Sequence, residues 1–231
     1  MRQIYTDGTY LGNNPSWHQE DSSWKAKQIA RILEANALTP RNVCEVGCGA
    51  GEVLSQLSKL YGNEVHFYGY EISPQAHDLC KKLSKANLTF VLQDLLEENS
   101  ATFDVVLAID VIEHVEDVFG FLRKLKDKGK YKIFHIPLDL SVQTVLRSSP
   151  IAAARESVGH IHYFTKEIAL ELLKDTGYEI VDFFYTASSL ELPNRGWKSK
   201  LLSLPRKCAF SINEDWAVRV LGGYSLLVLA Q

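Results

Sequence analysis

The sequence of 231 residues predicts a doubly wound α/β fold, in which a mostly parallel, seven-stranded sheet carries helices on both faces. Two observations predict it. Short apolar runs alternate along the chain with segments whose apolar residues recur at helical spacing. These runs are nearly continuously apolar, as in strands buried on both faces, and do not alternate with polar residues. In such a fold the ligand site lies at the carboxyl ends of the strands, near the first strand.

The elements can be placed in chain order from these patterns. Residues 1–22 form an irregular arm before a first helix at 24–37, which ends ahead of Pro40. The arm is rich in aromatic and imidazole side chains, namely Tyr5, Tyr10, Trp17 and His18. Strands are expected at 42–46, 65–70, 88–92, 103–109, 132–136, 178–185 and 224–229, the last of them antiparallel. Further helices are expected around 53–61, 74–83, 118–125 and 166–175.

Two segments interrupt this alternation. Residues 138–162 show no clean periodicity, and residues 187–223 precede the last strand. We expect both insertions, together with the arm, to form a lid over the ligand site. The second insertion places Lys198, Lys200, Arg206 and Lys207 beside apolar residues. This pattern is typical either of a solvated helix packed on the core or of an amphipathic helix that contacts an anionic lipid or ligand.

The composition is that of a globular domain, with 46% hydrophobic and 23% charged residues, so we expect one domain over residues 1–231. A net charge of −3 provides no general attraction to phosphate, which disfavours nucleic acid as a partner. Residues 1–17 do not resemble a signal peptide, and no stretch approaches the roughly 18 apolar residues of a membrane span. The cysteines have neither disulfide nor zinc-site spacing, so we expect buried thiols in a cytoplasmic protein.

Three glycines alternate in the turn between the first strand and the next helix. Gly47, Gly49 and Gly51 allow the backbone to adopt positive φ and to lie close to a ligand, beside the free N–H groups of the helix. Their GxGxG spacing differs from the GxGxxG of dinucleotide-binding proteins. The turn therefore predicts a nucleoside-type ligand of another kind.

Further motifs extend this turn into a family resemblance. Residues 45–51 read E-V-G-C-G-A-G, Glu71 ends the second strand, and Asp94 follows the third. Residues 110–115 read D-V-I-E-H-V after the fourth strand, and residues 159–165 read G-H-I-H-Y-F-T before a late helix. In this order they resemble the class I S-adenosylmethionine-dependent methyltransferases, in particular the branch that acts on small molecules.

The resemblance implies a Rossmann-like methyltransferase fold, S-adenosylmethionine as cofactor, S-adenosylhomocysteine as product, and O- or C-methylation of a small-molecule acceptor. Glu71 would bind the ribose hydroxyls and Asp94 would contact the adenine. Glu45 would bind the glycine turn or, through water, the methionine amino group, because a carboxylate in an apolar strand needs partners. The implied cofactor-binding residues are Glu45, Gly47, Cys48, Gly49, Gly51, Glu71, Ile72, Asp94, Leu95 and Asp110.

The chemistry of the acceptor is less constrained by these motifs. Methyl transfer is an in-line displacement, so the protein mainly orients the nucleophile and excludes water. A general base would help an alcohol or phenol acceptor, and the candidates are His114, His135 and His160. Glu113 is either part of this group or a favourable charge at a helix start.

A second resemblance keeps a metal open as an alternative. In the small-RNA 2′-hydroxyl methyltransferases, carboxylates and histidines bind a divalent metal that lowers the pKa of a ribose hydroxyl. The corresponding residues here are Asp110, Glu113, His114 and His160, with Asp110 where that group has Glu. The acidic chain argues against RNA, and the carboxylate–histidine pair also occurs in family members without metal. We therefore expect no metal and no nucleic-acid acceptor.

Two further functions remain as alternatives. A noncatalytic adenosyl-binding or scaffold protein would keep the fold without transferring a methyl group. A nicotinamide-dependent oxidoreductase would need the GxGxxG turn and a suitably placed Tyr-x-x-x-Lys pair, neither of which is found.

Overall fold

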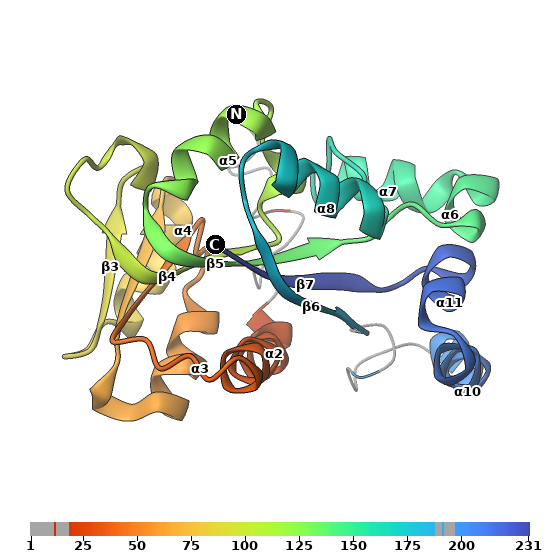
Figure 1. The fold of residues 1–231 in the computed structure, drawn as a ribbon, viewed down its shortest axis with the longest axis horizontal. Coiled ribbons are helices and arrows are strands. Elements are labelled where there is room, and N and C mark those ends of the chain that lie inside the picture. Colours follow the sequence, from red (N-terminus) through yellow and green to blue (C-terminus); the bar gives the residue numbers. More distant parts are fainter. Residues whose placement is uncertain (1–11, 13–18, 188–190, 192–196) are drawn as a thin grey trace.

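A computed structural model describes residue 12 and residues 19–187, 191 and 197–231, including the side chains of the last range from 205 onward. Tyr5, Tyr10, Trp17 and His18 of the arm lie outside the described residues, and of the four basic residues in the second insertion the side chains of Arg206 and Lys207 are described. Figure 1 shows the described elements as one sheet with helices on either side.

The sheet has seven strands in the order β3-β2-β1-β4-β5-β7-β6. The first five strands pair in parallel, whereas β7 is antiparallel to both β5 and β6. This confirms the predicted doubly wound sheet and its antiparallel last strand. The strands are β1 (Asn42–Val46), β2 (His66–Glu71), β3 (Leu88–Leu92), β4 (Phe103–Ile109), β5 (Gly129–Pro137), β6 (Ile180–Thr186) and β7 (Ser225–Ala230).

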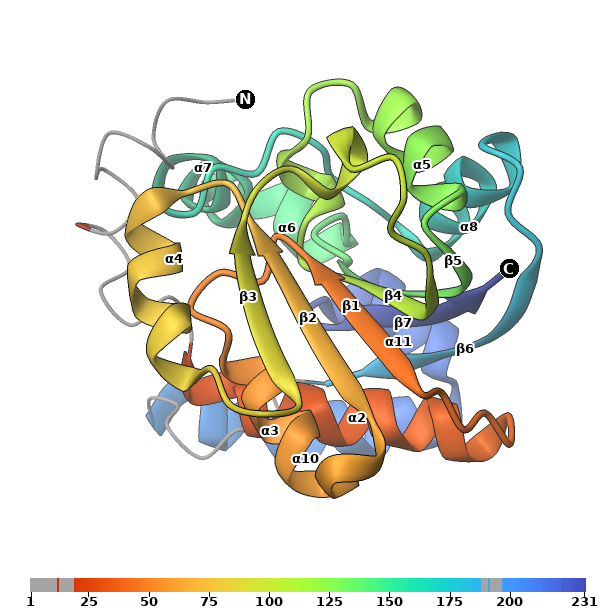
Figure 2. The same cartoon turned by 90° about the vertical axis from the view of Figure 1, so that its left-hand side faces the viewer.

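Helices cover both faces of the sheet. One apolar cluster joins the sheet to α2, α3 and α4, and a second joins the opposite face to α5, α8 and α11 (Figures 1 and 2). Neighbouring residues of a strand point to opposite faces, so Val43 of β1 belongs to the first cluster and Cys44 to the second. The helices are α2 (Ser22–Ala35), α3 (Glu52–Tyr61), α4 (Pro74–Cys80), α5 (Val118–Lys126), α6 (Val142–Arg147), α7 (Ser149–Ser157), α8 (Lys166–Asp175), α10 (Trp197–Ile212) and α11 (Glu214–Leu221).

The first insertion is more helical than the sequence predicts, whereas a helix is expected in the second. Residues 138–162 contain α6 and α7, and residues 197–221 contain α10 and α11. Glu113 and His114 lie in a short 3-10 turn, Ile112–His114, whereas the sequence places them at the start of a helix. Within the described ranges, none of the helices has the length and apolarity that a membrane span requires.

Candidate active site

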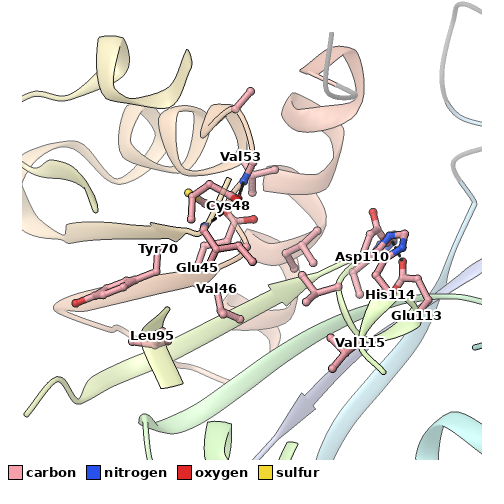
Figure 3. Close-up of a pocket in the computed structure, with 18 of the residues that line it drawn as sticks. Glu45, Val46, Cys48, Val53, Tyr70, Leu95, Asp110, Glu113, His114 and Val115 are labelled. Carbon is pink, nitrogen blue, oxygen red and sulfur yellow. Dashed lines mark hydrogen bonds and ion pairs between the residues drawn. The ribbon is translucent and has the colours of Figure 1, made fainter. Parts of the chain in front are cut away.

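A cavity of about 620 Å³ opens at the carboxyl ends of β1, β2 and β4 (Figure 3). This is where a doubly wound sheet places its ligand, because the connections of neighbouring strands leave to opposite faces there. Its volume falls in the range of small-molecule sites. All ten cofactor-binding residues predicted from the sequence line it, as do the three candidate histidines.

The glycine turn forms one wall of the cavity. Gly47, Gly49 and Gly51 have φ angles of +65°, +53° and +79°, a region that favours glycine. The backbone amides of Gly47 and Cys48 both donate to the carbonyl of Tyr70, which fixes the turn to β2. These bonds hold the glycine backbone along the cavity, where a ligand can approach it closely because the glycines have no side chains.

Gly51 has a second reason to be glycine. It caps the N-terminus of α3, and a Cβ placed there would lie 2.6 Å from the ring of Phe90 and 2.6 Å from the Cβ of Cys80. The close approach brings α3 against β3. The third glycine of the motif therefore serves helix packing, in addition to lining the cavity.

The carboxylate of Glu71 lies at the end of β2 and is buried. Oε2 accepts a hydrogen bond from the Gly49 amide at 2.8 Å. Oε1 accepts from the amides of Ile72 at 2.9 Å and Ser73 at 2.7 Å. Burial raises the pKa of Glu71, while these three N–H donors oppose that shift. The carboxylate is thus held rigidly beside the glycine turn.

Glu45 of β1 is the least satisfied acid of this wall. It is 3% exposed, and its Oε2 has no hydrogen-bond partner among the described residues. Burial raises its pKa to about 8, with Glu71 and Asp110 adding to the shift and Lys25 opposing it. A buried polar atom without a partner is costly, so this oxygen is available to a ligand that donates to it.

The loop after β3 contributes Asp94 and Leu95. Oδ1 of Asp94 accepts from the amide of Leu96 at 2.9 Å and so caps the 3-10 turn Leu95–Glu97. Leu95 is buried in the core and forms an apolar part of the cavity lining. The cap explains part of the need for an acid at position 94, while the residue still lines the cavity.

Asp110, directly after β4, holds together a buried network. Its Oδ2 lies 2.8 Å from Nζ of Lys25, and its Oδ1 lies 2.5 Å from Nδ1 of His135. Burial alone would raise the pKa of Asp110, but the positive partners His135 and Lys25 outweigh it and hold that pKa well below its usual range. The backbone of Asp110 has a φ of +54°, an uncommon value for a non-glycine residue that often marks functional sites.

His135 has partners for both ring nitrogens. Besides Asp110, its Nε2 lies 2.9 Å from Oγ1 of Thr186, and its ring packs edge-on against Trp24. A histidine held in this way orients its neighbours, so we do not carry it forward as a base. Lys25 and Trp24 were not predicted as site residues, because one lysine and one tryptophan at a helix start have no local signature.

Three other side chains converge at the far end of the cavity. Glu113 is fully buried, and its Oε1 lies 3.9 Å from Nε2 of His114 and 4.0 Å from Nε2 of His160. Nδ1 of His160 donates to Oδ2 of Asp139 at 2.7 Å. His162, two residues on, bonds instead to the carbonyl of Val115. Of the four residues in the metal alternative, the structure groups Glu113, His114 and His160, while Asp110 bonds to Lys25 and His135.

The insertions contribute unequally to the cavity. Val158 and His160 of the first insertion line it, whereas no residue from 197 to 223 does so within the described part of the chain. That second segment instead borders a neighbouring hollow of about 650 Å³ next to α6 and α7, through Arg206 and Gly223. Pro137 and Ser225 line both hollows.

The cavity is strongly acidic. Among its described lining residues, Lys25 is the one lysine or arginine, against nine carboxylates. The carboxylates are Asp21, Glu45, Glu52, Glu71, Asp94, Asp110, Glu113, Glu116 and Asp117. Such a lining favours a cationic ligand and disfavours the pyrophosphate of a dinucleotide or the backbone of a nucleic acid.

Comparisons with known proteins agree with this geometry. Residues 16–182 match the family model described as "Methyltransferase domain". A stretch of 108 residues is 31% identical to norajmaline N-methyltransferase from Rauvolfia serpentina and covers 44% of this chain and 36% of that protein. A stretch of 106 residues is 36% identical to the mitochondrial ubiquinone biosynthesis O-methyltransferase of Schizosaccharomyces pombe and covers 42% of this chain and 37% of that protein. The matched part thus spans about a third of these relatives.

Solved structures share the fold at low sequence identity. Magnesium protoporphyrin IX methyltransferase from Synechocystis PCC 6803, with bound SAH, superposes with a TM-score of 0.61 at 20% identity over 99% of this chain and 91% of that chain. The N-methyltransferase NodS of Bradyrhizobium japonicum, in complex with S-adenosyl-L-homocysteine, gives a TM-score of 0.55 at 13% identity over 89% and 84%. Both carry the Rossmann-like arrangement of strands and helices seen in this chain.

Proposed function

Because this chain belongs to the methyltransferase domain family, we propose that it transfers a methyl group from S-adenosylmethionine to an oxygen atom of a small-molecule acceptor. The observation that carries the proposal is the acidic cavity at the strand ends, with a glycine turn on one side and a carboxylate–histidine cluster on the other. The first side suits a nucleoside with an amino-acid tail, and the second suits the acceptor.

The residues present fit the cofactor. The buried Oε2 of Glu45 has no described partner, and Glu45 lines the cavity, which supports a role in binding the ammonium group of the cofactor. The carboxylate of Glu71 is fixed by three amides; Oε1 accepts two of these bonds, whereas Oε2 accepts one and keeps a lone pair for a ribose hydroxyl. Asp94 and Leu95 would contact the adenine, and Gly47 with Gly49 would lie along the amino-acid tail. The net positive charge of a sulfonium with an amino group matches the acidic lining.

The chemistry divides between cofactor and protein. When bound, S-adenosylmethionine supplies a methyl carbon activated by its positively charged sulfur. The glycine turn and Glu71 hold one reactant in place, which lowers the entropic part of the barrier. The acceptor hydroxyl must lose its proton as its oxygen attacks, and Glu113, His114 and His160 are the polar groups at that end of the cavity.

Two observations support a small acceptor. The cavity of about 620 Å³ must hold both reactants, and its lining of nine carboxylates repels a polyanion such as RNA. Two of the relatives named above are, by their names, a norajmaline N-methyltransferase and an O-methyltransferase of ubiquinone biosynthesis. An oxygen acceptor is favoured over an amine because the histidine and carboxylate groups would aid proton loss.

Calorimetric titration with S-adenosylhomocysteine tests the cofactor site directly. We expect one site per chain, and about a 10- to 100-fold weaker affinity in Glu71→Gln, which loses a charged hydrogen-bonding partner. Glu64→Gln, an exposed acid in the turn before β2, is the matched control and should bind like the wild type. Transfer of a labelled methyl group to phenols and catechols, compared with amines, then tests the acceptor. An absence of heat with either form of the cofactor, or transfer to amines alone, would contradict the proposal.

A further inference from the structure

The side chain of Glu113 is buried without a hydrogen-bond partner among the described residues. It is 0% exposed, and within the same part of the chain neither of its carboxylate oxygens is hydrogen-bonded. A buried acid with both oxygens unsatisfied is unfavourable unless another group compensates it, and so calls for a ligand.

Two imidazoles face this carboxylate across a short gap. Nε2 of His114 lies 3.9 Å and Nε2 of His160 lies 4.0 Å from Oε1 of Glu113. One ligand atom from each of the three residues falls within 4.8 Å of the others. The two rings are edge to face, with centroids 4.9 Å apart. The gap is too wide for direct hydrogen bonds and close to the spacing around a shared ion.

The residues behind the histidines prepare them as ligands. His160 donates from Nδ1 to Asp139, so its Nε2 carries the lone pair that faces Glu113. Carboxylate–histidine pairs of this kind orient the imidazole and raise its basicity in metal sites. The imidazole of His114 is held by a backbone partner. The Gly159 backbone hydrogen-bonds the same ring.

We propose that Glu113, His114 and His160 bind one divalent transition-metal ion of the Zn²⁺ type at the acceptor end of the cavity. Two imidazoles and one carboxylate suit such an ion and leave coordination positions open toward the cavity. Ligand atoms about 2.1 Å from Zn²⁺ lie roughly 3.4 Å apart in a tetrahedron. The Glu113–histidine distances of 3.9 and 4.0 Å must therefore shorten by about half an ångström, and a separation of up to 4.8 Å within the group by more than about one ångström, through side-chain rotation. Asp110, named with them from the sequence, is not a ligand because Lys25 and His135 occupy its oxygens. The proposal replaces our expectation of a metal-free site.

The role of the ion rests on the proposed function, whereas the binding site itself does not. An ion at this place would stabilise the deprotonated form of an acceptor hydroxyl. The O–H bond breaks and its proton passes to solvent. An electron pair of the oxygen forms the bond to the methyl carbon, while the carbon–sulfur bond breaks and its electrons stay on sulfur. The acceptor class is then a phenol, catechol or other hydroxyl compound that can approach the ion.

The test measures metal binding without turnover. The full-length protein, freed of metal with a chelator and saturated with S-adenosylhomocysteine, is titrated with Zn²⁺ by calorimetry and with Co²⁺ by visible absorption. We expect one ion per chain. Glu113→Gln and His160→Asn should each lose at least about 100-fold in affinity, because they remove a ligand. Asp139→Asn should lose about 10- to 100-fold, since it removes the support of His160.

The control is His66→Asn, at the exposed start of β2, which should bind Zn²⁺ like the wild type. Unchanged affinity for S-adenosylhomocysteine in Glu113→Gln and His160→Asn shows that these variants fold. If the wild type takes up neither ion at 100 µM, or if both ligand variants retain full affinity, the metal site is refuted. Because the cofactor titration is separate, that result would leave the proposed methyl transfer intact, and failure of cofactor binding alone would leave the metal site intact.

Discussion

The ion pair between Lys25 and Asp110 lends itself to a quantitative test. The two charges are 2.8 Å apart, and their side chains are 15% and 28% exposed. At an effective dielectric constant of about 20 their attraction is about 6 kcal/mol, most of which offsets the loss of hydration. Removing one partner of a buried pair lowers the free energy of unfolding by about 3–5 kcal/mol. Because both side chains are partly exposed, we expect a loss at the lower end of this range for Lys25 and Asp110.

We expect Asp110→Asn to lower the free energy of unfolding by about 3 kcal/mol, because it leaves Lys25 without its carboxylate and releases His135. Lys25→Met should cost about 2 kcal/mol, since Asp110 keeps its bond to His135. The double variant should cost about 3 kcal/mol, less than the two single changes added together. The coupling energy would then be about 2 kcal/mol, measured by urea unfolding with equal m-values.

A surface pair of similar length is the matched control. Nζ of Lys174 lies 2.7 Å from Oε1 of Glu171 on α8, but these side chains are 52% and 64% exposed. A cycle with Lys174→Met and Glu171→Gln should give about 0.5 kcal/mol or less. If the Lys25 and Asp110 variants were additive within about 0.5 kcal/mol, like this pair, the reasoning from burial would be refuted.

Three other predictions follow from the same walls of the cavity. Gly51→Ala should lower stability in urea by about 2–5 kcal/mol, because φ is +79° and the new Cβ meets Phe90 at 2.6 Å; a loss below about 1 kcal/mol would contradict this. Glu45 has a pKa of about 8 in the fold against 4.5 ordinarily, so its contribution is complete below pH 4.5 and is lost as pH rises through 8. Glu45→Gln should therefore flatten the decline in the free energy of unfolding between about pH 5 and 9. An unchanged slope would show that the Glu45 carboxyl does not lose its proton in this range. Asp94→Asn keeps a capping side chain, so we expect unchanged stability with several-fold weaker binding of S-adenosylhomocysteine by calorimetry; equal affinity would show that Asp94 only caps its turn.

The strands could be predicted from sequence because their apolar runs are determined locally. Residues 103–109 and 42–46 were expected as strands and form β4 and β1 with the same bounds. The helices of the first insertion could not be predicted in this way. Val142, Val145 and Leu146 of α6 are 51%, 55% and 80% exposed, so no buried face imposes a helical pattern on the sequence.

The cavity was partly predictable for a related reason. The glycine turn and Glu71 are close to one another along two adjacent strands, and their spacing indicates a nucleoside site. Lys25, by contrast, reaches Asp110 only because α2 packs across the sheet, a contact over 85 positions of sequence. The pairing of Asp139 with His160 likewise depends on how α6 and α7 return to the sheet, which periodicity does not reveal.

The antiparallel strand β7 has a consequence for how the chain folds during synthesis. Its residues 225–230 are all buried and separate β5 from β6, which precede them in the sequence. On the ribosome, β6 therefore has no neighbour to pair with until these residues emerge, and the edge of β5 stays open. Such edges recruit other strands, so a nascent chain ending before position 225 should depend on chaperones and aggregate more readily than the finished sheet.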